Sequence, residues 1–333
     1  MTQIVQIEQA LLEWINSSTA FKCQKIEMIF GDASFRRYFR FRDELTHTSI
    51  IAVDAPPEFE DSCKFVNLAN AYFQHQVIVP KVLAHNPKLG FYCLQDFGDM
   101  QFSQGLNLDT MHHLYTQALN QIPAIQSCMV SNGQPLPLYD DELLAKEKYI
   151  FTHWLIEVHL NIKLTKSQLD TVEKSYEFLH RTFKSQPQVG VHRDFHSRNL
   201  MLLANGDIGV IDFQDAVIGP ITYDAVSLLR DCYQKWPSEQ VDELLRQFHQ
   251  RFYGQYPWQD FLCWFDLSGM QRHLKASGIF CRLFHRDGKS DYLTHISRTL
   301  DYILEVGKKY LELTELVALI DNIVKPKLLE LSK

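Results

Sequence analysis

The chain has 333 residues, of which 33 are basic, 40 are acidic and 46% are hydrophobic, a composition typical of a globular protein with about two domains or one domain of two lobes. The net charge of −7 argues against a protein that binds nucleic acid through a broad basic face, but it is compatible with a local basic pocket. The 7 cysteines form no C-x-x-C pair and no apolar run approaches the roughly 20 residues needed to cross a bilayer, so neither a disulfide framework, nor a zinc site, nor a membrane span is indicated.

The N-terminal part of the chain predicts a helix followed by a small antiparallel sheet. Apolar residues recur at three- and four-residue steps over residues 4–15, as on one face of an amphipathic helix. Short β-type segments bounded by turn residues then predict five strands, with a helix over residues 59–75 between the third and the fourth. These strands are expected at residues 26–30, 37–42, 49–53, 81–85 and 90–95.

The remainder of the chain is predicted to be mainly helical. Residues 108–186 have the pattern of long helices with one proline-rich interruption at residues 131–137. Two short apolar runs, at residues 200–203 and 208–211, are joined by the turn sequence Ala-Asn-Gly-Asp and predict a β-hairpin. The helical pattern resumes after Tyr223, and no internal repeat suggests a solenoid. We therefore expect an α+β protein with a β-rich N-terminal lobe and a helical C-terminal lobe.

The densest group of polar residues surrounds the predicted hairpin, in the segments VHRDFHSRNL and IDFQ. Asp194 and Asn199 have the spacing of the kinase catalytic loop H-R-D-x-x-x-x-N, and Asp212 follows the second apolar run. Phosphoryl transfer needs one carboxylate that receives the acceptor hydroxyl proton and oxygen ligands that hold Mg²⁺ against the nucleotide phosphates. Asp194 fits the first role, and Asn199 and Asp212 fit the second. The alternative is that these side chains only cap turns around a hairpin.

Together with the two-lobed pattern, these motifs resemble the aminoglycoside phosphotransferase branch of the kinase-like fold. The resemblance implies a two-lobed protein-kinase-like architecture with ATP and Mg²⁺ as cofactors. It places a small antiparallel nucleotide lobe at residues 1–95, a hinge at residues 96–100, and a larger helical lobe with the catalytic loop and the acceptor site at residues 101–333.

A D-F-G sequence at residues 96–98 is not the metal-binding motif, because it precedes the catalytic loop by nearly a hundred residues and ends the fifth predicted strand. In similar kinases this position is the hinge, so the resemblance implies that Gln95, Asp96 and Phe97 bind the adenine. Gln214 stands where protein kinases have glycine after D-F, and no A-P-E segment follows. Both departures disfavour a protein kinase.

The turn GDASFRR between the first two predicted strands is in the place of a phosphate-covering loop. We expect Ser34 and Arg36 to contact the phosphates, and the alternative is a plain hairpin turn with solvated arginines. The third strand lacks the lysine that usually pairs with the α- and β-phosphates. Either Arg36 or Arg37 would then replace it. The missing lysine also leaves open a nucleotide-binding regulator without turnover.

Three further segments narrow the resemblance to the bacterial anomeric kinases of N-acetylmuramate and N-acetylglucosamine. They are GDASFRRYFRFR, VDAPPE, and QRHLKASGIFCR with the RDGK that follows it. The resemblance spans about residues 5–330 and implies an ATP-dependent transfer to the anomeric hydroxyl of the sugar in cell-wall recycling. A kinase of the same fold that acts on an aminoglycoside, choline or homoserine is the alternative acceptor class.

Candidate contacts with the acceptor are Arg230, Arg272 and His273, which bring donors into helical segments that are otherwise apolar. A surface ion pair at Arg230 and a solvated helix face around Arg272 are the alternatives. Asp224 either caps the helix that it starts or braces the catalytic loop. We expect a cytoplasmic enzyme with a small sugar as its partner, without nucleic acid, membrane or an obligatory protein partner.

Overall fold

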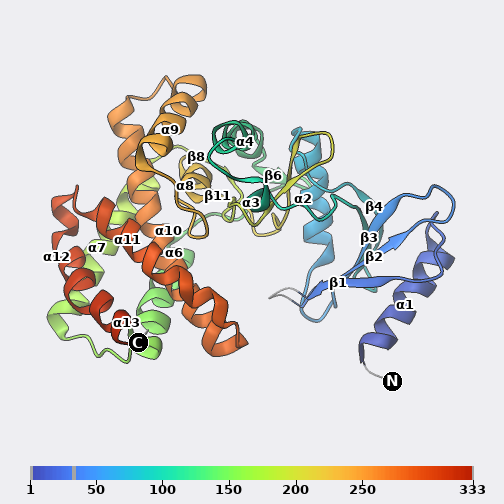
Figure 1. Ribbon diagram of the computed structural model, residues 1–333, viewed down its shortest axis with the longest axis horizontal. Helices are drawn as coiled ribbons and strands as arrows, with labels where there is room; N and C mark the ends of the chain where they lie inside the picture. Colours follow the sequence, from blue (N-terminus) through green and yellow to red (C-terminus); the bar gives the residue numbers. More distant parts are fainter. Residues whose placement is uncertain (1–2, 32–34, 332–333) are drawn as a thin grey trace. The chain divides into compact units, whose positions relative to one another are not determined.

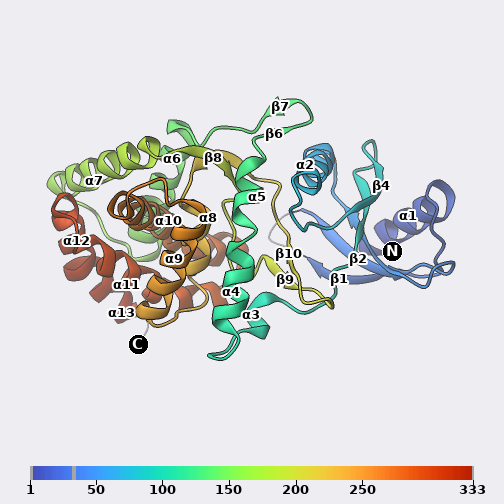
Figure 2. The same ribbon diagram turned by 90° about the horizontal axis from the view of Figure 1, so that it is seen from above.

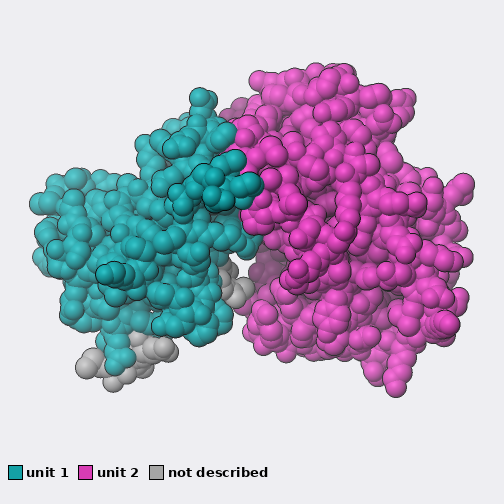
Figure 3. Space-filling model, turned by 180° about the vertical axis from the view of Figure 1, so that it is seen from behind, with its two compact units in different colours: residues 1–105, 130–135, 199–215 teal, residues 106–129, 136–198, 216–333 magenta. Residues whose placement is uncertain are grey.

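The structure is a computed structural model that describes residues 3–31 and 35–331 (Figure 1). The chain divides into two compact units, which Figure 3 distinguishes by colour. Unit 1 comprises residues 1–105, 130–135 and 199–215, and unit 2 comprises residues 106–129, 136–198 and 216–333. Unit 1 is thus built from three separate stretches of the chain, one of which is the predicted hairpin.

Unit 1 contains the predicted five-stranded antiparallel sheet, which is confirmed. Its strands have the order β1-β2-β3-β5-β4, and all neighbouring strands are antiparallel. The strands are β1 (Glu27–Gly31), β2 (Arg37–Arg42), β3 (Ser49–Asp54), β4 (Val82–Asn86) and β5 (Phe91–Gln95).

Each face of this sheet is packed against a helix because side chains alternate between the two faces along every strand. The helix α1 (Gln3–Ser18) packs its apolar stripe on one face. On the other face, Phe65 of helix α2 (Ser62–Gln74) stacks on Tyr92 with ring centroids 5.0 Å apart. Helix α2 begins later than the sequence predicts, because Asp61 accepts hydrogen bonds from two backbone N–H groups of its first turn and acts as the N-cap. At the contact between α1 and the sheet, the helix contributes Leu11, Trp14 and Ile15, and the sheet contributes Phe39, Phe41, Ile50, Ala52, Phe91 and Cys93.

The predicted hairpin is also confirmed, and it belongs to unit 1. Strands β9 (Leu200–Leu202) and β10 (Ile208–Val210) pair antiparallel, and the backbone N–H of Val210 donates to the carbonyl of Ile78 at 2.7 Å. Phe213, just after β10, stacks on Phe65 of α2 with centroids 4.8 Å apart. The segment that carries Asp212 is therefore anchored to α2 and to the loop that follows α2. The short helix α3 (Phe102–Gly105) and the two-residue strands β6 (Val130–Ser131) and β7 (Gln134–Pro135) complete unit 1.

Unit 2 is mainly helical, as predicted, and is organised around the 30-residue helix α10 (Trp258–Asp287). Helix α10 contacts η1 (Ile150–His159), α7 (Lys166–Ser185), α8 (Tyr223–Leu229) and α11 (Ile296–Gly307). Figure 2 shows α7, α8 and α11 near α10. The helices of unit 2 before α10 are α4 (Met111–Leu119), α5 (Ile122–Ser127), α6 (Asp141–Tyr149), the π-helix η1 (Ile150–His159), α7 (Lys166–Ser185), α8 (Tyr223–Leu229) and α9 (Ser238–Phe252). Those after it are η2 (Ser290–His295), α11 (Ile296–Gly307), η3 (Leu311–Leu313), α12 (Thr314–Leu319), η4 (Ile320–Val324) and α13 (Lys325–Leu331).

One ladder of unit 2 was not predicted from the sequence. Strand β8 (Gln188–Val191) pairs antiparallel with β11 (Val217–Pro220) on either side of the catalytic-loop and hairpin segments. Four-residue strands that contain glycine and proline carry little local signal, so only the long-range pairing defines them. At Gly190 a Cβ atom would lie 2.4 Å from the carbonyl oxygen of Cys128, so this strand packs against the end of α5 only with glycine there.

Candidate active site

The catalytic-loop motif joins strand β8 to strand β9, and the second aspartate motif follows strand β10. Arg198 is the last residue of this loop in unit 2, and Asn199 begins the segment that belongs to unit 1. The predicted site residues therefore form two groups, one in each compact unit.

The predicted metal ligands Asn199 and Asp212 lie together in unit 1. Nδ2 of Asn199 donates to Oδ2 of Asp212 at 3.3 Å, and Nε2 of Gln214 donates to Oδ1 of Asp212 at 2.9 Å. The backbone N–H of Ile211 donates to the carbonyl of Asn199 at 3.0 Å, which holds the two segments side by side. Asp212 has a φ of 62°, a left-handed backbone that costs a non-glycine residue energy and is concentrated at functional sites.

The chemistry of this donor set fits Mg²⁺. A carboxylate and an amide oxygen are hard ligands, and Mg²⁺ is usually held by one or two such groups together with water and substrate phosphates. No group of three or more His, Cys, Asp or Glu side chains that could hold a metal occurs among the described residues. A cation at Asp212 would therefore depend on the nucleotide phosphates for the rest of its coordination, as in phosphoryl transfer.

Arg36 is the basic residue that unit 1 places against this pair. Its Nη2 atom lies 3.4 Å from Oδ1 of Asp212 and its Nε atom lies 3.9 Å from Oε2 of Glu60, just before α2, while its side chain is 6% exposed. The neighbouring Phe35 stacks on Phe59 with centroids 4.3 Å apart, so the end of the turn is held against the segment that leads into α2. A guanidinium beside the carboxylate of a predicted metal ligand has the charge and the donors that a phosphate contact needs.

Arg37, the other candidate, is engaged elsewhere. It pairs with Asp54 across the β2–β3 ladder, with Nη1 and Oδ2 3.2 Å apart. The structure thus brings Arg36, and not Arg37, next to Asp212. Ser34, the other predicted phosphate contact, lies outside the described residues.

The predicted hinge residues follow strand β5 in unit 1. The carboxylate of Asp96 accepts from Nε and Nη2 of Arg40 at 2.7 and 3.1 Å and from the backbone N–H of Gly98 at 2.8 Å. Burial raises the pKa of Asp96, but these donors outweigh it and lower the pKa overall. The Phe97 ring packs so closely on Gly209 of β10 that a Cβ there would lie 2.6 Å from it. The side chains of Asp96 and Phe97 are thus held within unit 1, while Gln95 is exposed.

In unit 2, Asp194 is surrounded by positive charge. Burial alone would raise the pKa of this carboxyl, but Lys275, His196, Arg193 and Arg272 together hold it well below its usual range. The side chain is therefore ionised throughout the physiological pH range. A carboxylate in this state can accept a hydrogen bond from a hydroxyl and orient it.

Asp224 holds the start of the catalytic loop through two hydrogen bonds to its backbone. Its Oδ2 accepts from the backbone N–H of His192 at 2.8 Å and its Oδ1 accepts from that of Arg193 at 3.1 Å. Arg193 has a φ of 77°, so these two bonds stabilise a left-handed turn just before Asp194. Burial raises the pKa of Asp224 to about 6. Of the two sequence interpretations, the structure supports the brace.

Glu147 of α6 is a buried carboxylate that the sequence interpretation missed. It balances part of the positive charge around Asp194, namely that of Arg193 and Lys275. It is 1% exposed, and its oxygens lie 3.5 Å from Arg193 Nη2, 3.4 Å from Lys275 Nζ and 3.2 Å from Gln271 Nε2. Lys275 also donates to the Tyr223 hydroxyl at 3.1 Å. The polar residues of α10 therefore face the interior beside the catalytic loop. The only sequence signal was the presence of charges within a long apolar helix.

Comparisons with known proteins identify the family of this chain. A family model described as "Phosphotransferase enzyme family" matches residues 25–261. The chain belongs to this phosphotransferase family. It is 36% identical over 339 residues to the N-acetylmuramate/N-acetylglucosamine kinase of Neisseria meningitidis serogroup B, with 98% of each chain covered. It is 37% identical to the enzyme of that name from Pseudomonas aeruginosa, covering 88% of this chain and 87% of the relative.

Solved structures of other phosphotransferases share the fold. An ethanolamine kinase of Plasmodium vivax matches with a TM-score of 0.63 and 10% identity, over 83% of this chain and 81% of its own. The choline kinase LicA of Streptococcus pneumoniae matches with a TM-score of 0.61 and 10% identity, over 90% and 99% of the two chains. The ADP-bound aminoglycoside phosphotransferase APH(2'')-Ib matches with a TM-score of 0.57 and 14% identity, over 89% and 98%. The predicted kinase-like fold is confirmed.

The three predicted acceptor contacts of this phosphotransferase lie inside unit 2. Arg230 pairs with Asp266 at 2.6 Å, with both side chains buried. Nε2 of His273 bonds to the Arg230 carbonyl at 2.8 Å, its ring stacks on Tyr302, and burial lowers its pKa to about 3. Arg272 is 4% exposed and its Nη1 lies 3.4 Å from Cys232 Sγ. The alternative of a solvated helix face around Arg272 is wrong, because packing of α10 at the centre of unit 2 buries that segment.

Asp231 has a role that its sequence context did not indicate. It is fully buried, and its two oxygens accept from the backbone N–H groups of Ser197 and Tyr233 at 2.9 and 2.8 Å. It therefore ties the catalytic loop to the segment after α8. The alternative of a surface ion pair at Arg230 is wrong, because Arg230 and the neighbouring Asp231 are both buried.

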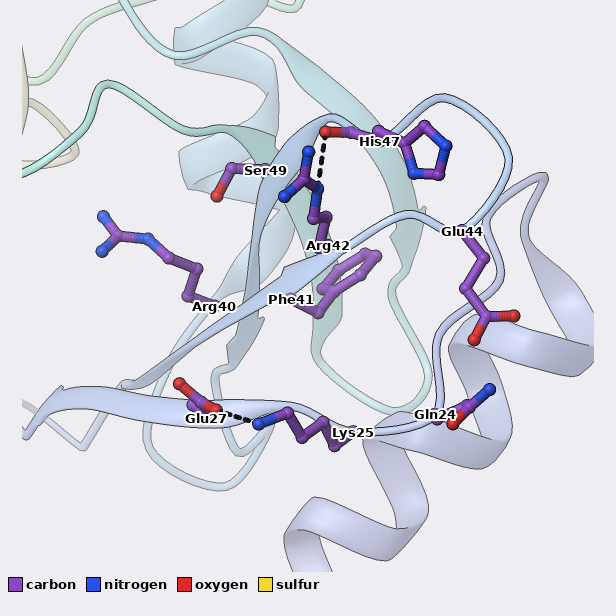
Figure 4. Close-up of a pocket in the computed structure, with 9 residues that line it drawn as sticks. All are labelled: Gln24, Lys25, Glu27, Arg40, Phe41, Arg42, Glu44, His47 and Ser49. Atoms are coloured by element: carbon purple, nitrogen blue, oxygen red, sulfur yellow. Dashed lines mark hydrogen bonds and ion pairs between the residues drawn. The ribbon is translucent and has the colours of Figure 1, made fainter.

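A groove of about 770 Å³ on unit 1 is lined by none of the predicted site residues, although Arg40, the partner of Asp96, is part of its lining (Figure 4). Charged side chains of both signs line it, and some pair within it, such as Lys25 with Glu27 at 2.6 Å. Nε of Arg42 donates to the carbonyl of His47 at 3.0 Å. The size of this groove therefore does not identify the active site. None of the described helices has the length and apolar character needed to cross a membrane.

Proposed function

We propose that this protein is an ATP-dependent, Mg²⁺-dependent sugar kinase that phosphorylates the anomeric hydroxyl of N-acetylmuramate or N-acetylglucosamine. The observation that carries the proposal is the contact between Asn199 and Asp212, in the segments that bear the kinase-type motifs of this family. The acceptor is proposed from the relatives that carry these sugars in their names and match nearly the full chain. A cytoplasmic place in the recycling of cell-wall sugars belongs to the same proposal.

Unit 1 would hold the nucleotide. Backbone groups of residues 95–97 would bind the adenine, since the Asp96 side chain is already satisfied by Arg40 and Gly98. Asn199 and Asp212 would ligate Mg²⁺, which neutralises charge on the β- and γ-phosphates when bound. Arg36 would supply the positive charge that the third strand lacks.

Unit 2 would hold the acceptor, with Asp194 as its base. An anomeric hydroxyl is more acidic than an ordinary alcohol, so a carboxylate of low pKa is an adequate proton acceptor late in the transfer. The anomeric oxygen forms a bond to the γ-phosphorus while the bond from that phosphorus to the β–γ bridging oxygen breaks. ADP leaves, and the hydroxyl proton passes to Asp194. Asp224 and Asp231 would fix the loop that presents this carboxylate.

A phosphate-transfer assay with Mg²⁺ and ATP on a panel of acceptors tests this function. The panel contains the two N-acetyl sugars, their α-methyl glycosides, an aminoglycoside, choline and homoserine. We expect turnover of the free sugars and none of the methyl glycosides, because the glycosides lack the anomeric hydroxyl. Preferential turnover of the aminoglycoside, choline or homoserine would reassign the acceptor. ATP binding without any product across the panel would favour a regulator.

A further inference from the structure

Three arginines of unit 2 surround the same two residues, Cys232 and Tyr233. The guanidinium of Arg198 lies over the Tyr233 ring, 3.9 Å from its centroid. Nη1 of Arg298 donates to the Tyr233 carbonyl at 2.7 Å, and Nη1 of Arg272 donates to Cys232 Sγ at 3.4 Å. Arg198 comes from the catalytic loop, Arg272 from α10 and Arg298 from α11, so the group exists only in the folded unit.

None of these guanidinium groups forms a close ion pair with a carboxylate of the described residues, although Arg272 also feels the charges of Asp231 and Asp194. Among the described residues, none of the three arginines lies within 4.0 Å of an acidic side chain, although most of the other buried arginines of the chain do. Asp231, one of the carboxylates that act on Arg272, uses both oxygens on backbone N–H groups. Arg272 is buried, and Arg198 and Arg298 are partly buried. Desolvated cations without a close ion pair are costly, so this arrangement favours an anion from outside the chain.

Further contacts hold Arg198 in place, and Arg272 acts on the proposed base Asp194. Nη2 of Arg198 lies 3.2 Å from Nε2 of His295, and the guanidinium also lies 5.4 Å from the Tyr292 ring centroid. Burial, Arg198 and Arg298 lower the pKa of His295 to about 4, so at neutral pH this imidazole is uncharged and accepts from Arg198. Arg272 is also one of the charges that lower the pKa of Asp194.

We propose that Arg198 and Arg272 form an anion subsite beside Asp194 that binds the carboxylate of an acidic acceptor sugar. The inference rests on the proposed function. It predicts that the subsite distinguishes the two proposed acceptors by whether they carry a carboxylate. N-acetylmuramate carries a carboxylate on its lactyl ether, whereas N-acetylglucosamine is the same sugar without it. A planar guanidinium held on an aromatic ring binds a carboxylate through paired N–H groups with little loss of conformational entropy. Arg298 contributes charge to the subsite while its N–H groups hold the backbone.

The test compares both sugars in the parent enzyme and in Arg198→Gln and Arg198→Lys. Loss of a charge-assisted hydrogen bond predicts a fall of about 10- to 100-fold in kcat/KM for N-acetylmuramate in R198Q, and less than about 3-fold for N-acetylglucosamine. R198K should fall between parent and R198Q, since it keeps the charge but loses the planar pair of donors. Arg181→Gln, on the exposed side of α7, is the matched control and should leave both values unchanged.

Equal losses for the two sugars in R198Q would overturn the subsite and make Arg198 a residue that only positions the loop. No loss for either sugar would overturn it as well. Calorimetric titration of each sugar into the same proteins keeps the test independent of turnover. If the parent phosphorylates neither sugar, the proposed function fails, and the subsite then stands only if N-acetylmuramate binds and loses affinity selectively in R198Q. Weaker binding confined to Arg272→Lys, with R198Q unaffected, would contradict the pairing of the two arginines.

Discussion

Arg36 and Asp212 are 176 residues apart in the chain, yet the guanidinium of Arg36 lies 3.4 Å from the carboxylate of Asp212. This contact gives unit 1 a cation at the proposed metal site although strand β3 has no lysine. We expect Arg36→Gln to lower kcat/KM for ATP by about 100-fold, the order found when one preorganised donor to a developing charge is lost. Steady-state kinetics with ATP as the varied substrate measures the effect.

Arg37→Gln is the control for that variant. Arg37 pairs with Asp54 across two strands and is not next to Asp212, so its loss should change kcat/KM by no more than about 5-fold. Equal losses in the two variants would mean that the arginines act only through the conformation of the turn.

The second prediction concerns the metal. Asp212→Asn keeps the size of the side chain and removes its charge, which weakens the attraction for a hard divalent cation. We expect the Mg²⁺ concentration that gives half-maximal turnover to rise by at least about 10-fold. Titration of activity with Mg²⁺ at fixed ATP measures it. An unchanged Mg²⁺ requirement would show that Asp212 is not a ligand.

The third prediction concerns the base. Asp194→Asn should lower kcat by about 1000-fold, because the amide cannot take the hydroxyl proton. The KM for ATP should stay near that of the parent, since the proposed nucleotide contacts are elsewhere. Asp170→Asn, an exposed site on α7, is the matched substitution. Near-normal turnover of the Asp194 variant would exclude the proposed role.

The fourth prediction concerns Glu147. Its removal leaves Arg193 and Lys275 buried without their carboxylate, so Glu147→Gln should lower the free energy of unfolding by about 3 kcal/mol. Glu173→Gln removes a partly exposed pair with Lys148 and should cost less than about 1 kcal/mol. Urea unfolding of both variants gives the comparison. Similar small losses would show that the network contributes little to the stability of unit 2.

The fifth prediction is a pH dependence of stability from His273. Burial lowers its pKa to about 3, so below pH 6.5 the unfolded chain binds a proton that the folded chain does not. Stability should therefore fall as the pH drops from 6.5 toward 3, by up to about 1.4 kcal/mol per pH unit from this residue. Urea unfolding at pH 7.0, 6.0 and 5.0 should show a smaller slope in His273→Gln than in the parent. His113→Gln, at an exposed position of α4, should keep the parental slope.

The sequence by itself determined the family, the five strands of unit 1 and the hairpin, and it supplied Asp194, Asn199 and Asp212 as the residues proposed for the site. These features are local, because each depends on a short segment of the chain. The signals are the alternation of apolar residues, the turn residues and the spacing of the motifs. The start of α2 was displaced by only three residues, because the capping by Asp61 competes with the apolar pattern before it.

The tertiary structure alone decided which arginine meets Asp212, which carboxylate balances Lys275 and how Asp231 is used. Each of these depends on residues far apart in sequence, such as Lys275 and Glu147 or Asp231 and Ser197. An isolated charge in an apolar helix has the same sequence pattern whether it faces solvent or a buried partner. Only the packing of α10 at the centre of unit 2 determines that these charges are buried. A buried charge requires a partner, and that partner lies far away in the sequence.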